Sequence, residues 1–185
     1  PKLKNNELTP IINSVHLEHL ITTRKNYSLD LIKNLNIFFN EDAPSISNCG
    51  NATSPHMWEN TETITIIFTS GSYGKPKPVE LSIINFLASY QNWNNVIKFT
   101  YDDSILNILP LHHIAGFSSI IRGLISNCPV FLQDQFVIEK IISGINSQKL
   151  TIVSLVPTMI YKFLENDEGI EYLQSFRMIL FGGGS

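Results

Sequence analysis

The sequence predicts an α/β protein with a mostly parallel sheet flanked by helices. From Thr63 onward, short apolar segments alternate with longer segments of helical periodicity. The short segments are continuously apolar, as expected for strands that are buried on both faces. Because strands that alternate with helices favour parallel pairing through crossover helices, we expect helices on the faces of one sheet.

Each element of this pattern follows from its composition and its boundaries. The expected strands are Thr63–Phe68, Ser104–Leu109, Pro129–Leu132, Thr151–Val156 and Met178–Phe181. The expected helices are Ser82–Ile97, Gly116–Ser126, Val137–Gln148 and Pro157–Glu165. Ser82 is a suitable N-cap, and Pro157 fits a first helical turn, where its missing N–H costs nothing.

The N-terminal third carries weaker signals. We expect a short helix that leads into a strand at His19–Thr22, then a mixed apolar run at Leu29–Phe39. Glu41–Glu59 is rich in Asn, Ser, Pro and Asp, which indicates a loop or linker. The predicted organisation is a weakly defined N-terminal portion over residues 1–60 and the main α/β segment over residues 61–185.

Composition excludes several classes of function. The 185 residues suffice for one ordinary domain, and a net charge of −3 suggests neither a nucleic acid nor an anionic membrane as partner. No apolar run reaches the roughly 18 residues of a membrane-spanning helix. Cys49 and Cys128 are far apart with no CxxC motif, so we expect unpaired thiols. His16, His19 and His56 lack metal-ligand spacing, so no protein-held metal is predicted.

The loop Thr69–Pro78 directly follows the first strand of the alternating region, with the sequence Thr-Ser-Gly-Ser-Tyr-Gly-Lys-Pro-Lys-Pro. Glycines let backbone N–H groups turn toward an anion, while hydroxyls and lysines add donors and charge. A polar turn is the simpler alternative, but this many phosphate-type groups after a buried strand favour phosphate binding. The candidate ATP-phosphate-binding residues are Thr69, Ser70, Gly71, Ser72, Gly74, Lys75 and Lys77.

This loop is not a Walker-type phosphate loop. Only Ser72 and Tyr73 separate its two glycines, whereas the Walker motif needs a longer stretch. Pro76 follows Lys75 and disfavours helical backbone at the lysine. The predicted phosphate-binding element is therefore a loop that does not run directly into the N-terminus of a helix.

Three loops follow predicted strands directly: Thr69–Pro78, Pro110–Gly116 and Gly182–Ser185. Ligands of parallel α/β sheets bind at the carboxyl ends of the strands. We therefore expect the three loops to meet at one edge of the sheet.

A single charged residue, Arg122, stands in an otherwise apolar predicted helix. An unpaired buried charge costs several kcal/mol, so the guanidinium must find an anion or reach solvent. A structural ion pair or a snorkelling side chain would satisfy it, and so would a substrate carboxylate held bidentately. His113 precedes the same helix. Three positions are open for its side chain: it could cap the helix, face water, or line one pocket with Arg122.

The segment Thr69–Lys77 resembles the phosphate-loop signature of the acyl-adenylate-forming superfamily, which includes acyl-CoA synthetases and adenylation domains of peptide synthetases. Two positions depart from the usual signature. Tyr73 stands where Thr is usual, and Pro78 stands where Gly is usual and removes a backbone donor. The resemblance implies part of the large N-terminal domain of an adenylate-forming enzyme.

Within that superfamily, Pro110–Arg122 is similar to the o-succinylbenzoate–CoA ligases of menaquinone and phylloquinone biosynthesis. Ser154–Met159 and Phe176–Gly184 are similar to the same group. The resemblance implies that His113 borders the acyl pocket and that Arg122 binds the distal carboxylate of the substrate. The implied substrate-binding residues are His113, Ser118, Arg122, Gly182, Gly183 and Gly184.

The implied function is that of an ATP-dependent acid–thiol ligase. A carboxylate attacks the α-phosphate of ATP to give acyl-AMP and pyrophosphate, and CoA thiolate then displaces AMP. ATP, Mg²⁺ and CoA are the implied small molecules, with Lys75 and Lys77 on the phosphates. The family's adenine-binding motif, ribose-binding aspartate and catalytic lysine lie downstream of Ser185, so no catalytic residue is assigned. We expect a piece of a longer protein that is inactive alone, in a bacterial cytoplasm or a plastid stroma.

Three alternatives remain open from the sequence. A ligase for another aromatic or fatty acid would keep the phosphate loop without needing Arg122 to bind a second carboxylate. A degenerate nucleotide-binding module would bind ATP without forming an adenylate. A dinucleotide-binding module is the least favoured, because no GxGxxG motif follows a strand.

Overall fold

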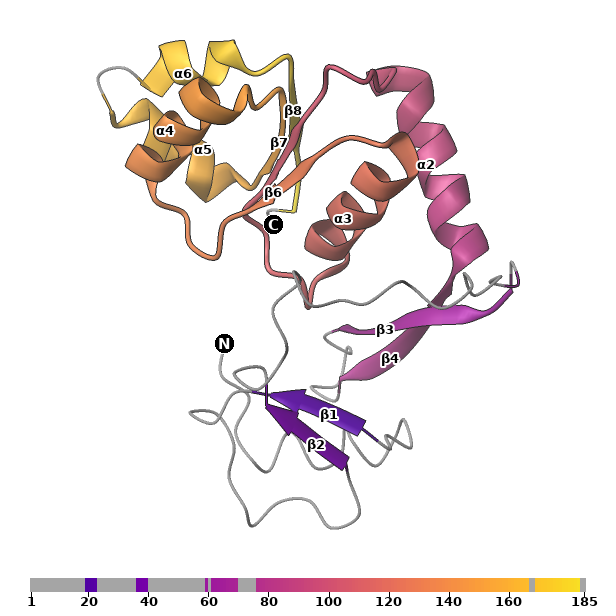
Figure 1. The fold of residues 1–185 in the computed structure, drawn as a ribbon. Helices are drawn as coiled ribbons and strands as arrows, with labels where there is room; N and C mark the ends of the chain where they lie inside the picture. Colours follow the sequence, from indigo (N-terminus) through magenta and orange to yellow (C-terminus); the bar gives the residue numbers. More distant parts are fainter. Residues whose placement is uncertain are drawn as a thin grey trace. The chain divides into compact units, whose positions relative to one another are not determined.

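The computed structural model describes residues 19–22, 36–39, 59, 61–69, 76–166 and 169–183 (Figure 1). These residues fall into two units. The first contains β1 (His19–Thr22), β2 (Asn36–Phe39) and the first two residues of β4 (Lys77–Ser82), and the second contains β3 (Thr63–Thr69), the rest of β4 and everything from α2 onward. In chain order, those further elements are α2 (Ile83–Ile97), β5 (Ile105–Asn107), α3 (Ile114–Ser126), β6 (Val130–Leu132), α4 (Ile138–Gln148), β7 (Ile152–Leu155), α5 (Pro157–Leu164), α6 (Gly169–Ser175) and β8 (Met178–Phe181).

In the first unit, β1 and β2 pair in parallel, with His19 opposite Asn36. The strand predicted at His19–Thr22 is thereby confirmed. β2 lies at the end of the mixed apolar run, for which the sequence indicated no particular element.

The second unit is built around a four-stranded parallel sheet in the order β6-β5-β7-β8. This sheet confirms the predicted α/β class with parallel pairing. β3 does not join it: within the described residues, β3 pairs with β4 in a separate two-stranded sheet. The expectation that the three loops meet at one edge of the sheet holds for the loops after β5 and β8. The loop after β3 follows a strand of a different sheet, and most of its residues lie outside the described part of the chain.

Both faces of the parallel sheet are apolar because successive side chains alternate between them. On one face, Leu106, Val153 and Ile179 pack in a cluster with residues of α4, α5 and α6. On the other face, Ile105 and Ile152 pack with Ile97 at the end of α2. Figure 1 shows α4, α5 and α6 gathered on one side of the strands and α2 with α3 on the other. This burial on both faces explains why the strands are continuously apolar.

The helices start near their predicted residues. Ser82 is the N-cap of α2, and its backbone N–H donates to Asn85 Oδ1 at 2.9 Å. Pro157 is the first residue of α5, as predicted. α3 begins at Ile114, two residues before its predicted start, and α6 was not predicted at all. Within the described part of the chain, no helix is long and apolar enough to cross a membrane.

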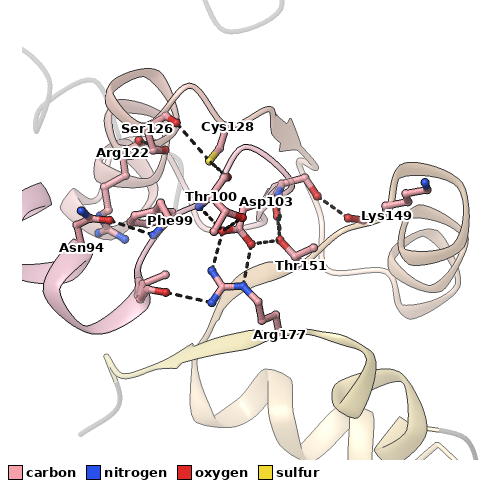
Figure 2. A network of polar contacts seen from close by, with 12 residues as sticks. Asn94, Phe99, Thr100, Asp103, Arg122, Ser126, Cys128, Lys149, Thr151 and Arg177 are labelled. Atoms are coloured by element: carbon pink, nitrogen blue, oxygen red, sulfur yellow. Dashed lines mark hydrogen bonds and ion pairs between the residues drawn. The ribbon is translucent and has the colours of Figure 1, made fainter.

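A polar network ties the amino ends of β5, β7 and β8 together (Figure 2). Arg177, just before β8, donates from Nε and Nη2 to the carboxylate of Asp103 at 2.9 and 2.7 Å. Asp103, just before β5, also accepts from Thr151 Oγ1 at 2.9 Å and from the backbone N–H of Thr100 at 2.8 Å. Arg177 Nη1 donates to the carbonyl of Ile97 at 3.0 Å. The polar groups of this network satisfy one another's hydrogen-bonding capacity. They lie at the edge of the sheet opposite the carboxyl ends of its strands.

Burial alone would raise the pKa of Asp103, whose side chain is 2% exposed. The hydrogen bonds from Arg177, Thr100 and Thr151 outweigh burial, and the pKa of Asp103 is lowered. The carboxylate therefore stays ionised and serves as a structural anchor.

Candidate functional site

The strand order places a switch point between β5 and β7. The chain leaves β5 through α3 to reach β6 on one side, whereas β7 lies on the other side of β5 and continues into α5. α3 lies on the face of Ile105, and α5 lies on the opposite face. Neighbouring strands whose connections leave on opposite faces open a crevice at their carboxyl ends, where α/β proteins bind ligands.

Asn107, the last residue of β5, shapes the turn that leads into α3. Its side chain is buried, accepts a hydrogen bond from Leu109 N at 3.1 Å and donates to the carbonyl of Gly116 at 3.1 Å. A Cβ on Gly116 would lie 2.4 Å from the carbonyl oxygen of Pro110, so only glycine fits there. No local pattern marks Asn107 as a functional residue, because it stands within an apolar strand.

His113 is the N-cap residue of α3, at the carboxyl end of β5. Its backbone N–H donates to the carbonyl of Pro110 at 3.0 Å, and its side chain is exposed. The rings of His112 and His113 lie 4.2 Å apart between centroids. Partial burial and the neighbouring charge of His113 lower the pKa of His112. An exposed imidazole pair thus stands at the predicted edge of the sheet.

Arg122 lies in the last two turns of α3, where its guanidinium carbon is 5.5 Å from the centre of the Trp93 ring of α2. The Nε atom of Arg122 is buried and has no hydrogen-bond partner among the described residues. Burial lowers the pKa of this arginine, although a guanidinium remains charged at neutral pH. No carboxylate of the described residues pairs with it, so the structural ion pair considered above does not form within the described part of the chain.

The structure does not bring His113 and Arg122 into contact. The helix that separates them rises by about 13 Å and turns through roughly two and a half turns. Ser118 lies between them in α3 and is buried. A ligand that reached both His113 and Arg122 would therefore have to extend along α3.

Gly182 and Gly183 follow β8 directly, at the same edge as the turn after β5. The backbone N–H of Gly182 donates to the carbonyl of Leu155 at 3.4 Å. Gly183 has a φ of +79°, a backbone conformation that favours glycine. Gly184, the last glycine of the predicted set, lies outside the described residues.

Only the ends of the predicted phosphate loop are described. Thr69 is the last residue of β3, and Lys77 is the first residue of β4. The remaining candidates lie outside the described residues: Ser70, Gly71, Ser72, Gly74 and Lys75.

Two further observations bear on binding. A hollow of about 200 Å³ is lined by Pro157, Ile160, Tyr161 and Phe181 at the carboxyl ends of β7 and β8. This volume is below the roughly 300 Å³ at which small-molecule pockets begin, and its lining offers few polar groups to orient a ligand. Among the described residues, no group of three or more His, Cys, Asp or Glu side chains could hold a metal ion.

A parallel sheet with a switch point, a histidine at the N-cap position of a helix and a glycine turn at its carboxyl edge define an α/β protein of the class that binds small molecules at that edge. The model of the AMP-binding enzyme family matches residues 1–185, and the chain belongs to this family.

Several relatives are similar over the same region. A 2-succinylbenzoate–CoA ligase of Bacillus pumilus is 30% identical over 98% of this chain and 38% of its own length. The enzyme of that name from Listeria monocytogenes is 35% identical over 69% of this chain and 27% of its own length. A solved structure of O-succinylbenzoate coenzyme A synthetase from Bacillus subtilis, in complex with ATP and magnesium ion, superposes with a TM-score of 0.83 at 25% identity, covering 99% of this chain and 38% of that one. The chain thus spans well under half the length of these relatives.

Proposed function

We propose that this chain is part of an ATP-dependent ligase that joins a carboxylic acid, o-succinylbenzoate, to CoA. An oxygen of the substrate carboxylate attacks the α-phosphorus of ATP, the bond to the β-phosphate breaks, and pyrophosphate leaves. The CoA thiolate then attacks the acyl carbon of the acyl-adenylate and releases AMP. ATP and CoA are substrates in this proposal, and Mg²⁺ arrives with the ATP phosphates.

The choice of o-succinylbenzoate as the acid rests on one observation, the burial of Arg122 without a neutralising carboxylate in the described part of the chain. Its guanidinium is largely withdrawn from solvent, and no carboxylate of the described residues neutralises it. A buried polar group without a partner costs about 1–3 kcal/mol, and more when it is charged. An acid with a second carboxylate would supply the missing partner in a geometry that guanidinium suits. The similarity to ligases named for 2-succinylbenzoate supports the same acid.

We assign the other sequence-derived residues to the same reaction. Thr69, Lys77 and the loop between them hold the ATP phosphates electrostatically as pyrophosphate leaves. His113 borders the acyl pocket at its exposed end, Ser118 lies along its helical wall, and the glycine turn from Gly182 lets the acyl-adenylate approach the backbone. The relatives named above are bacterial, which favours a bacterial cytoplasm over a plastid stroma.

The test is ATP–pyrophosphate exchange by the full-length protein, with o-succinylbenzoate, benzoate and a fatty acid offered separately. Exchange reports only the first half-reaction, so it does not depend on CoA. We expect exchange with o-succinylbenzoate alone. The Arg122→Leu variant should then raise the KM for that acid by about tenfold to a hundredfold, as expected for a lost charge-assisted pair.

Each other outcome selects a different function. Exchange with benzoate or the fatty acid instead would retain an adenylate-forming ligase and reject o-succinylbenzoate. A folded protein that binds ATP and exchanges with no acid would be the degenerate nucleotide-binding module, with Tyr73 and Pro78 as the departures that explain it.

A further inference from the structure

We infer that Trp93 of α2 is a positioning residue for Arg122, and that the pair selects acids with a second carboxylate. This inference rests on the proposed function and adds to it the residue that orients the guanidinium. Trp93 reaches the substrate only through Arg122.

The contact between α2 and α3 brings the two side chains together. Phe86 of α2 and Phe117 of α3 pack with ring centroids 5.7 Å apart, and Phe86 is buried. Further along the same pair of helices, the Arg122 guanidinium lies over the Trp93 ring at 5.5 Å. A cation within about 6 Å of an indole centre is attracted by the negative face of the ring. The rigid aromatic pair thus sets the helix spacing at which Trp93 meets the charge.

The guanidinium uses one of its surfaces and leaves another available. An indole ring engages the face of the planar group, whereas a carboxylate approaches its edge in the plane of the N–H donors. Within the described part of the chain, the Nε nitrogen of the guanidinium is buried without a partner. Among the described residues, the two Nη nitrogens have no hydrogen-bond partner either, so their N–H groups remain for an incoming anion. Trp93 therefore fixes the plane without occupying the donors.

Other groups near this contact are already engaged within the protein. Asn94, beside Trp93 in α2, accepts a hydrogen bond from Phe99 N at 3.0 Å through Oδ1. Trp93 itself is 39% exposed, so it contributes little to the core. A half-exposed indole that contacts an unneutralised arginine is more simply explained by orientation of that arginine than by packing.

The experiment uses the full-length protein and two acids. The first acid is o-succinylbenzoate, and the second is benzoylpropionate, which lacks the carboxylate on the aromatic ring. We expect Trp93→Leu to raise the KM for o-succinylbenzoate by about three- to thirtyfold, the range of a cation–π contact. The kcat, the KM for ATP and the KM for benzoylpropionate should change by less than about twofold. Trp93→Phe keeps an aromatic face and should restore most of the affinity.

A matched control separates positioning from helix packing. Tyr90 lies one turn earlier in α2, and its ring stacks on that of Phe99 with the centroids 5.8 Å apart. Tyr90→Leu should leave the ratio of the two KM values unchanged. In an Arg122→Leu background, Trp93→Leu should have no further effect on that ratio, because the residue through which it acts is gone.

A spectroscopic readout makes the test independent of turnover. The sequence has two tryptophans, so a Trp58→Phe background leaves Trp93 as the reporter. Its emission should shift on addition of o-succinylbenzoate and stay constant with benzoylpropionate. Equal KM changes for both acids, or an unchanged Trp93 emission in a protein that adenylates o-succinylbenzoate, would overturn the inference and leave the proposed function standing. Absence of exchange with every acid in the unsubstituted protein would overturn both.

Discussion

At Gly116, the close approach of α3 to the preceding turn decides which side chain the chain accepts. A Cβ there would lie 2.4 Å from Pro110 O and 2.6 Å from Leu109 O, and both atoms belong to the backbone. Neither oxygen can move aside as the end of a flexible side chain would. Alanine, which normally favours a helix over glycine by about 1 kcal/mol, therefore becomes unfavourable at this position.

We predict that Gly116→Ala lowers the free energy of unfolding by about 2 kcal/mol, the cost of overpacking a buried site. Gly182→Ala is the matched control, because a Cβ on Gly182 would meet nothing within 4 Å. Its effect on stability should stay within about 0.5 kcal/mol. Urea unfolding of the two variants measures both values, and equal losses would mean that the turn before α3 relaxes freely.

Individual site residues could be predicted where the signal is local. His113 was placed after a strand, and it occupies the N-cap position of α3 at the carboxyl end of β5. Asn107 and Trp93 were not singled out, because their roles depend on the carbonyl of Gly116 and on the guanidinium of Arg122, which belong to a different element. A side chain whose partner is set by tertiary packing leaves no pattern in its own neighbourhood.

At the scale of elements, the apolar runs located every strand of the parallel sheet. They matched the bounds of β8 and overestimated the lengths of β5, β6 and β7. β5 covers Ile105–Asn107 within the predicted Ser104–Leu109, because regular pairing stops where Asn107 turns its amide toward the next loop. β4 was missed since Pro78 disfavours an ordinary strand, although a strand exposed along most of its length tolerates proline. α6 was missed because it begins at Gly169, a residue that usually ends helices.

The ion pair between Arg177 and Asp103 joins the starts of β8 and β5 across the sheet, so it links two separate strands. The pKa of Asp103 is lowered from its ordinary value of 3.8, so the folded state binds fewer protons than the unfolded state. The stabilisation is therefore complete above about pH 5 and is lost as the pH falls through the lowered pKa.

We predict that Asp103→Asn lowers the free energy of unfolding by roughly 2–3 kcal/mol at about pH 7, since Asp103 is buried but Arg177 remains 41% exposed. The loss should shrink at about pH 3, where the wild-type carboxylate becomes protonated. Asp134→Asn, at an exposed position before α4, is the control and should have little effect. Urea unfolding at the two pH values gives the comparison, and a loss independent of pH would contradict an ionic anchor.

At the scale of the whole molecule, sequence alternation predicted the class of fold but not the order of its strands. The switch point between β5 and β7 depends on which strands are neighbours, and nothing in the local composition of β5, β6 or β7 determines that order. The same limit explains the misplacement of β3, whose apolar composition suits either a buried parallel strand or the two-stranded sheet that it forms with β4.

The proposed two-step reaction makes a prediction about the full-length protein that concerns the phosphate loop. Lys75 is proposed to neutralise charge on pyrophosphate as it leaves, and this charge develops only in the adenylation step. Lys75→Gln should therefore lower ATP–pyrophosphate exchange by about tenfold to a hundredfold. Conversion of supplied acyl-adenylate to the CoA thioester should change by less than about twofold, because no pyrophosphate takes part in it.

The control for this prediction is Lys140→Gln, the same change of charge at an exposed position of α4. It should leave both half-reactions unaltered. Equal losses in the two half-reactions for Lys75→Gln would instead indicate a lysine that supports the fold or binds a group common to both steps. A selective loss of adenylation would assign the loop to the phosphates, whichever acid the protein activates, because exchange and thioester formation share the acyl-adenylate but only exchange involves pyrophosphate.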